Sequence, residues 1–199
     1  AALACVWQIR PQDIDHERAR GGGLALQRPA QSRNSSPSLL RALTESRDLS
    51  LLAVTMLLFH LGNAAMLPLF AQAIVARGLA DPSVFTASAI IVAQLVMIPV
   101  ALWAGWYASR HGYRTLVIAA LLALPMRGMI AACVESPWAL IPVQVLDGIG
   151  AGLLGVALPG LVANILQGTR HINSGLGAVM TIQGLGAAAS PALAGAIAQ

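Results

Sequence analysis

The stretch Gly105-Trp-Tyr-Ala-Ser-Arg-His-Gly-Tyr-Arg114 separates two long apolar runs, Phe85–Tyr107 and Thr115–Val134. Each run has about the 20 residues that a helix needs to cross the hydrocarbon core of a bilayer. The connection is short enough to be only a tight turn, and Gly112 predicts a turn with positive φ. We expect Gly105 to let two backbones approach closely. The stretch therefore predicts a hairpin of two membrane-spanning helices.

The composition agrees with a membrane protein. Hydrophobic residues make up 57% of the 199 residues and charged residues only 10%, whereas a soluble domain carries about 25% charged residues. The basic residues gather in the N-terminal stretch and in the later loops, which is typical of a polytopic membrane protein and not of a nucleic-acid-binding protein. The sequence contains no phosphate loop, metal-ligand cluster or nucleophile elbow. It therefore predicts no cofactor and no enzyme.

Five apolar runs predict an all-α, polytopic transmembrane helical bundle, residues 49–199. The predicted spans are residues 49–76, 84–107, 115–134, 138–166 and 175–198. Residues 1–9 indicate the end of a preceding transmembrane helix. Residues 10–48, rich in Gly, Pro, Ser and Arg, indicate a flexible cytoplasmic linker. Because both ends of the sequence lie within apolar runs, we expect a fragment of a longer protein.

The arginines predict the topology. The linker, the Gly105–Arg114 turn and the loop at residues 167–173 all carry arginine, whereas only Arg77 lies on the opposite side. The positive-inside rule places the arginine-rich segments in the cytoplasm. A basic linker could bind nucleic acid, but a solvated loop beside anionic lipid is the better interpretation. We therefore expect a lipid bilayer as partner, in a cell membrane and specifically a bacterial inner membrane.

The turn resembles a known signature. Its pattern G-x-x-A-S-R-x-G-x-R is similar to G-x-L-A-D-R-x-G-R-R, the loop motif of the major facilitator superfamily of transporters. The matching positions are Gly105, Ser109, Arg110, Gly112 and Arg114. The resemblance implies that the arginines act in gating, in a latch weakened because Ser109 replaces the family's Asp. Alternatively, the arginines only determine topology.

A second match lies in the fourth span. Gln144–Gly152 resembles the family pattern R-x-L-Q-G-x-G-x-A, with Gln144 in place of Arg and Asp147 in place of Gln. Gly148 and Gly152 form a small-xxx-small pair, and Gly150 adds another small position. Such residues predict close packing against a neighbouring helix or a substrate.

A third match lies in the last span, where residues 186–195 resemble the antiporter signature G-x-x-x-G-P-x-x-G-G. The residues that carry it are Gly186, Ser190, Pro191 and Gly195. We expect Pro191 to kink the helix and the small residues to form a close interface. The resemblance then implies that the five spans are the seventh to eleventh helices of such a transporter. An N-terminal six-helix half would be missing.

Two charged residues lie inside predicted spans, where ionised groups usually face a cavity or a partner. Asp147 is about ten residues beyond Pro137, or about 15 Å into the membrane at 1.5 Å per residue. Arg127 lies at a similar depth on the preceding antiparallel span. We hypothesise that the two pair, or that Asp147 exchanges a proton during transport. Alternatively, Arg127 snorkels outward and Asp147 makes a structural hydrogen bond.

Two polar residues of the first span share a helix face, because His60 and Asn63 are three residues apart. Pro68 cannot donate a hydrogen bond to the Ala64 carbonyl, so we expect an interrupted helix beside Asn63. Transporters often build binding sites at such interruptions. The candidates for the substrate and proton site are His60, Asn63, Gln144, Asp147 and Arg127. Their alternative role is hydrogen bonding between helices.

The sequence thus predicts a proton-coupled secondary transporter that moves a small-molecule substrate by alternating access. One alternative is specifically an efflux antiporter of drugs or metabolites, because the antiporter-like signature is present. Another is an intramembrane enzyme that uses Asp147 and His60, although no second carboxylate or Ser/Lys pair accompanies them. The last is a membrane fragment that does not transport.

Overall fold

The computed structural model describes residues 46–134, 136–167 and 171–197, and every element in those residues is helical. The elements are α4 (Arg47–Asn63), α5 (Met66–Ala76), α6 (Pro82–His111), α7 (Arg114–Cys133), the 3-10 helix η2 (Pro137–Ala139), α8 (Leu140–Ile165) and α9 (Ile172–Ile197). They form 5 segments that are long and apolar enough to cross a membrane, so the all-α class is confirmed. The predictions for residues 1–9 and most of the linker lie outside the described residues.

Local sequence sets where several helices begin and end. The Ser46 hydroxyl caps α4, and the Asp81 carboxylate accepts the N–H groups of Ser83 and Val84 at 2.9 and 3.1 Å at the start of α6. The first N–H groups of a helix have no backbone acceptor within it, so the capping side chains accept their hydrogen bonds instead. Gly112 ends α6 with φ of 79°, which confirms the predicted turn with positive φ.

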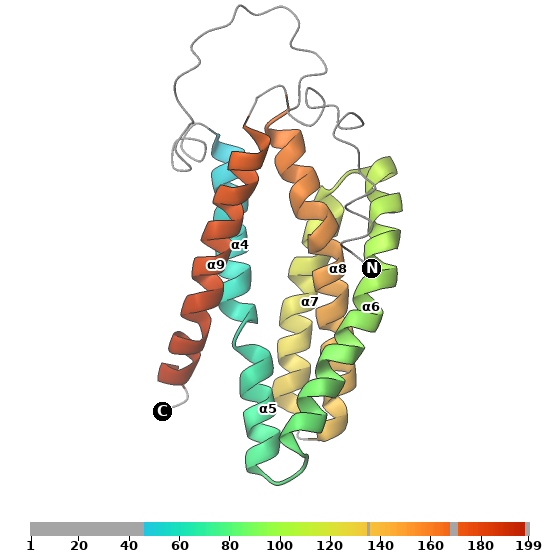
Figure 1. Cartoon of the computed structure of the whole chain (residues 1–199), viewed down its shortest axis with the longest axis vertical. Coiled ribbons are helices and arrows are strands. Elements are labelled where there is room, and N and C mark those ends of the chain that lie inside the picture. The colour runs from blue at the N-terminus through green and yellow to red at the C-terminus, as the bar shows by residue number, and fades with distance from the viewer. Residues whose placement is uncertain (1–45, 135, 168–170, 198–199) are drawn as a thin grey trace, which may run out of the picture.

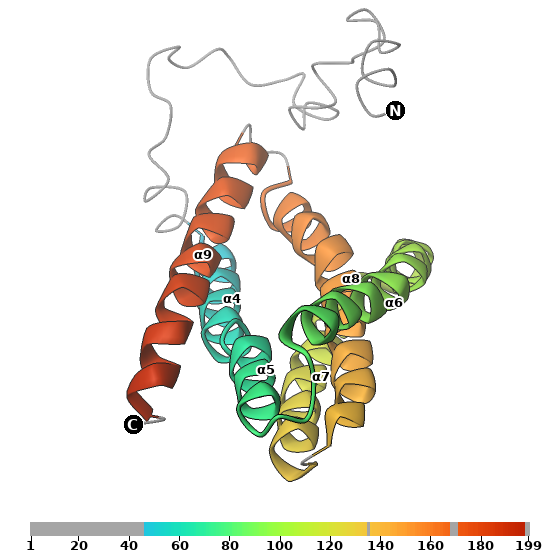
Figure 2. The same ribbon diagram turned by 60° about the horizontal axis from the view of Figure 1, so that its bottom comes forward.

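The helices pack in two groups. Figure 1 shows α9 along α4 on one side and α6, α7 and α8 together on the other, and Figure 2 shows the same division. The start of α4, the α6–α7 turn and the facing ends of α8 and α9 lie at one end of the bundle (Figure 1). The described helix ends that flank the three arginine-rich segments therefore lie at the same end of the bundle. Their assignment to the cytoplasm stays a prediction.

Much of the outer surface is apolar. On α6 the side chains of Leu95, Ile98 and Leu102 are 66%, 58% and 74% exposed. A continuous apolar surface of this kind is unfavourable in water and favourable in lipid, while the helical backbone satisfies its own hydrogen bonds. The outward faces of the bundle are therefore suited to hydrocarbon.

Glycines on α8 hold it against α6. A Cβ added to Gly148 would lie 2.5 Å from the Ala93 carbonyl oxygen, and one added to Gly152 would lie 2.9 Å from that of Met97. Both separations are too short for a side chain, so only glycine allows the two backbones to come this close. The predicted close interface of this small-xxx-small pair is confirmed.

The interface between α9 and α4 is built in the same way. A Cβ on Gly186 would lie 2.3 Å from the carbonyl oxygen of Leu57. One turn further along α9, Ser190 is buried with only 2% of its surface exposed. The close interface predicted for this part of the antiporter-like motif is therefore confirmed.

Other glycines of the predicted motifs make no such close contact with the described residues. A Cβ on Gly105, Gly150 or Gly195 would meet no described atom within 4 Å. Gly105 lies on an exposed part of α6, so the close backbone approach expected there is not made to any described residue and stays a prediction. Gly150 is two residues from Gly148 and so is turned by about 200° around the helix, away from the interface with α6. Gly195 comes five residues after Ser190, which itself contacts Ala65 beyond the last residue of α4.

Candidate functional site

A cavity of about 300 Å³ lies among α4, α7, α8 and α9. Apolar side chains make most of its wall, and a few polar groups gather on it. The polar residues that line it are His60, Asn63, Arg127, Asp147 and Gln183. A largely apolar cavity with a small number of polar groups is the usual form of a small-molecule site.

The centre of the site is an ion pair between consecutive spans. The Nη1 atom of Arg127 on α7 contacts the Oδ1 atom of Asp147 on α8. Both residues lie inside membrane-spanning helices. An isolated charge at the centre of such a helix would cost about 2.5–3.5 kcal/mol on insertion scales. The pairing offsets that cost, and it is the arrangement hypothesised for these two residues from their depth.

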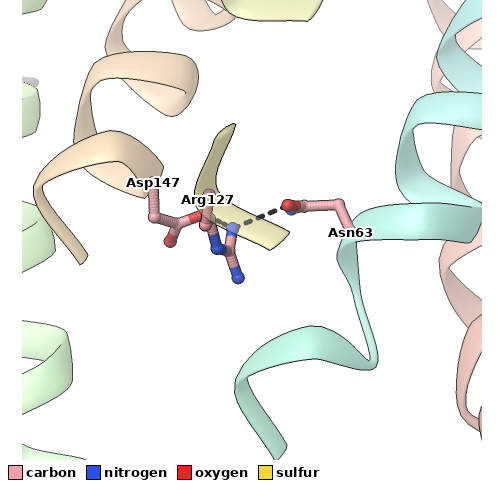
Figure 3. Close-up of polar contacts among 3 residues, drawn as sticks. All are labelled: Asn63, Arg127 and Asp147. Carbon is pink, nitrogen blue, oxygen red and sulfur yellow. Dashed lines mark hydrogen bonds and ion pairs between the residues drawn. The ribbon is translucent and has the colours of Figure 1, made fainter. Parts of the chain in front are cut away.

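Asn63, the last residue of α4, joins the pair. Its Oδ1 atom accepts a hydrogen bond of 2.6 Å from Arg127 Nη1 (Figure 3). The guanidinium thus connects α4, α7 and α8 through one nitrogen. Nε of Arg127 is buried and has no hydrogen-bond partner in the described part of the chain. The network therefore holds a buried cation whose donors are not all used.

The two charged groups are buried to different extents. The side chain of Arg127 is 3% exposed, whereas that of Asp147 is 29% exposed. Figure 3 shows one carboxylate oxygen of Asp147 turned toward Arg127 and the other turned away. The Arg127 side chain is therefore the more enclosed of the two, and the Asp147 side chain the more accessible.

A break in the first span positions Asn63. Helix α4 ends there and α5 begins at Met66, as expected because Pro68 lacks the N–H that would bond to Ala64. The N–H of Ala65 in the break donates a 2.9 Å hydrogen bond to the buried hydroxyl of Ser190 on α9. Sequence reasoning assigned Ser190 only to packing and missed this bond. The only available signal was the orphan N–H that any helix break creates.

His60 lies one turn before Asn63 on the same face, as predicted. Its Nδ1 is 2.9 Å from the carbonyl oxygen of Met56, which can only accept, so Nδ1 carries the proton. In the neutral imidazole, Nε2 is then an acceptor. His60 therefore adds a hydrogen-bond acceptor to the cavity, in which it is a lining residue.

One glutamine is placed differently from expectation, and a second one joins the site. Gln144, a predicted site residue, is 1% exposed and does not line the cavity, and neither atom of its amide has a partner among the described residues. Gln183 does line the cavity, from α9, and its buried Oε1 is also without a partner there. Four of the five predicted site residues thus meet at the cavity, and Gln183 joins them in place of Gln144.

The Gly105–Arg114 turn lies away from this cavity. Arg110 stacks on the Trp106 ring with its guanidinium carbon 4.5 Å from the ring centroid, and the Ser109 hydroxyl donates to the Trp106 carbonyl at 2.7 Å. Tyr113 fills the space left by Gly160, since a Cβ there would lie 2.2 Å from the ring. Ser109 and Arg110 are thus engaged within α6, and Tyr113 packs against α8. Their gating role stays a prediction.

Comparison with known proteins identifies relatives of the chain. Residues 7–199 match the family model described as the MFS_1 like family. Two proteins of Mycobacterium tuberculosis, strains CDC 1551 / Oshkosh and ATCC 25618 / H37Rv, are each named an uncharacterised MFS-type transporter and are 36% identical over 188 residues. The match covers 94% of this chain but 44% of each relative, so the chain spans about half the length of the curated relatives that it matches. No solved structure matches it.

Proposed function

Since this chain belongs to the MFS_1 like family of the major facilitator superfamily, we propose that the protein moves a small solute across a membrane by alternating access. The observation that carries the proposal is the network of Asn63, Arg127 and Asp147 on the wall of a largely apolar cavity. Charged groups inside a membrane most often serve the movement of a solute or ion.

The proposal includes coupling to protons. A proton that binds Asp147 removes its charge and weakens the contact with Arg127, which leaves the buried guanidinium to depend on Asn63. Protonation therefore changes how firmly α7 and α8 are held together at the site. The other titratable groups that line the cavity are His60 on α4 and Arg127 itself, while α9 contributes the uncharged Gln183. Asp147 is thus the carboxylate that would carry the coupling proton.

The chain is a multi-pass membrane protein, by its family and its apolar spans. We place it in a bacterial inner membrane, with the arginine-rich connections in the cytoplasm. In this proposal an N-terminal six-helix half supplies the opposite wall of the transport pathway. Nucleic acid has no part in it.

We do not extend the proposal to catalysis. The carboxylate of Asp147 has a guanidinium as its neighbour, and that guanidinium is also bonded to an amide. Such a set binds and balances charge, and among the described residues no hydroxyl, thiol or second carboxylate lines the cavity beside it. The antiporter-like motif suggests export as the specific direction of transport. In this structure two residues of that motif, Gly186 and Ser190, contact the α4–α5 span, so their contacts suit a packing role in either direction of transport.

Proteoliposomes test the proposed function. The protein would be expressed from its complete reading frame, reconstituted, and given an inward or outward proton gradient. A panel of organic cations, anions and neutral solutes would then be added while a dye reports internal pH. We expect at least one class of solute to cause a change in internal pH when it is added. Asp147→Asn should abolish that change. Asp48→Asn changes an exposed carboxylate on α4 and serves as the matched control. If no solute of any class accumulates or moves protons, the proposal is wrong.

A further inference from the structure

The polar groups of the cavity differ in what they offer to a ligand. The guanidinium of Arg127 is 3% exposed, and one of its nitrogens already serves two acceptors, Asn63 and Asp147. The carboxylate of Asp147 is 29% exposed, and one of its oxygens is turned away from Arg127 (Figure 3). The pair therefore forms a dipole whose negative end is the more accessible to the cavity.

Two further acceptors lie on other helices. His60 donates Nδ1–H to a carbonyl of its own helix, which leaves Nε2 of the neutral ring as an acceptor. Gln183 on α9 has a buried amide oxygen that has no donor among the described residues. A buried acceptor without a donor is costly, so a ligand that supplies N–H groups would be stabilised here. Asp147, His60 and Gln183 thus line the same cavity from α8, α4 and α9, and the buried oxygen of Gln183 meets a ligand when its amide turns toward the cavity.

The rest of the cavity wall is apolar. Side chains such as Met56, Phe59, Leu124 and Met180 line it, and its volume is about 300 Å³. Burying an apolar group against such a wall is favourable, and methionine adapts to ligands of different shape. The wall therefore fits a compact hydrocarbon or aromatic body rather than a sugar or another solute that is polar all round.

From this combination we propose that the solute is an amphiphilic amine: an apolar body that carries a protonated nitrogen. The ammonium group supplies three N–H donors and a positive charge for the Asp147 oxygen, His60 Nε2 and Gln183 Oε1. A carboxylate of the same shape would meet these acceptors, and of the ion pair it would find the Asp147 side chain, 29% exposed, more accessible than the Arg127 side chain, 3% exposed. The inference rests on the proposed function, since it names the class of solute that the transport site accepts.

Matched ligands test the charge preference. The protein from its complete reading frame would be placed in lipid nanodiscs, with empty nanodiscs as the blank. Binding of radiolabelled phenylbutylammonium would be measured in competition with phenylbutyrate and phenylbutanol, which share the same body. We expect the ammonium compound to bind at least about tenfold more tightly than the carboxylate, because a charge-assisted hydrogen bond is worth about that factor or more.

Variants assign the preference to this cavity. Asp147→Asn should remove the preference for the ammonium, whereas Asp48→Asn, outside the cavity, should leave it unchanged. Because Asp147→Asn leaves Arg127 without its partner and could impair folding, Gln183→Leu is the second variant. It keeps the ion pair, and we expect it to weaken ammonium binding several-fold with little effect on phenylbutanol.

The outcomes separate this inference from the proposed function. Equal or tighter binding of phenylbutyrate, or no ammonium binding above the empty nanodiscs, overturns the inference about the solute, whatever the transport assay gives. If the proteoliposomes then exchange protons for an anionic solute, the proposed transport function stands and only the inference about the solute class is lost. Conversely, the expected ammonium preference without any transport supports the solute class and contradicts the transport function.

Discussion

The backbone N–H of Ala65 donates a buried hydrogen bond of 2.9 Å to the hydroxyl of Ser190, which lies 125 positions later in the chain. This bond joins the break between α4 and α5 to the C-terminal half of α9. It satisfies a donor that the break would otherwise leave buried and unpaired. The same break ends α4 at Asn63, the residue that reaches Arg127. The Ser190 hydroxyl thus stabilises the local geometry on which one end of the charged network depends.

Removing that hydroxyl should destabilise the protein. Ser190→Ala leaves the Ala65 N–H buried without a partner, at a cost of about 1–3 kcal/mol. We expect a lower midpoint of thermal unfolding in detergent, measured by intrinsic fluorescence. Ser109→Ala is the control, because the Ser109 hydroxyl is exposed and bonds only within its own helix. Equal midpoints for the two variants would show that the Ser190 bond contributes nothing.

Gly186 should not tolerate a methyl group, whereas its neighbour on α9 should. The Cβ of Gly186→Ala would lie 2.3 Å from the Leu57 carbonyl oxygen, so α4 and α9 would have to separate. Overpacking of this kind costs about 1–3 kcal/mol. Gly184→Ala is the matched control, because a Cβ there meets no described atom within 4 Å. Folded yield after detergent extraction measures the difference, and an equal yield would contradict the close α4–α9 contact.

The ion pair should behave as a unit in a double-mutant cycle. Asp147→Leu leaves Arg127 as a buried unpaired charge, a change that costs about 3–5 kcal/mol in protein interiors. Arg127→Leu in the same protein removes that charge, so the double variant should be more stable than Asp147→Leu alone. Denaturant unfolding of the wild type, both single variants and the double variant gives the coupling free energy. Additive losses would mean that the two side chains do not interact.

The cap of α6 should give a pH-dependent contribution to stability. Hydrogen bonds from the Ser83 hydroxyl, the Val84 N–H and the Ser83 N–H hold the pKa of Asp81 below its ordinary value of 3.8. Because the folded-state pKa is lowered, the charged cap stabilises the fold above pH 3.8 and loses this effect as the pH falls through the folded-state pKa.

Asp81→Ala tests this contribution. The variant should therefore unfold at a lower temperature than the wild type at neutral pH, and the gap should narrow in acid. Circular dichroism melts at several pH values measure the gap. A gap that stays constant into acid, below the ordinary Asp pKa, would rule out a contribution from the ionised carboxylate.

Much of the fold could be predicted from the sequence because its signals are local. Hydropathy over about 20 residues marks a span, and Pro68 marks the break in the first one by lacking an N–H. Gly112 ends α6 with a positive φ because no Cβ opposes it. The approximate depths of Arg127 and Asp147 followed from a constant rise per residue, which was enough to anticipate that they could meet.

Other features depended on how the helices rotate and slide against one another, which no local pattern encodes. Gly105 and Gly148 look alike in sequence, yet of the two only Gly148 faces a neighbouring backbone among the described residues. Gln144 and Asp147 are close on one helix, yet only Asp147 lines the cavity. Local sequence was thus enough to predict the helices, the turns and the charges that had to be paired. Which helix faces meet is known only from the packed bundle, because packing between helices sets their rotation and register, and a small rotation moves a side chain from an interface to a cavity.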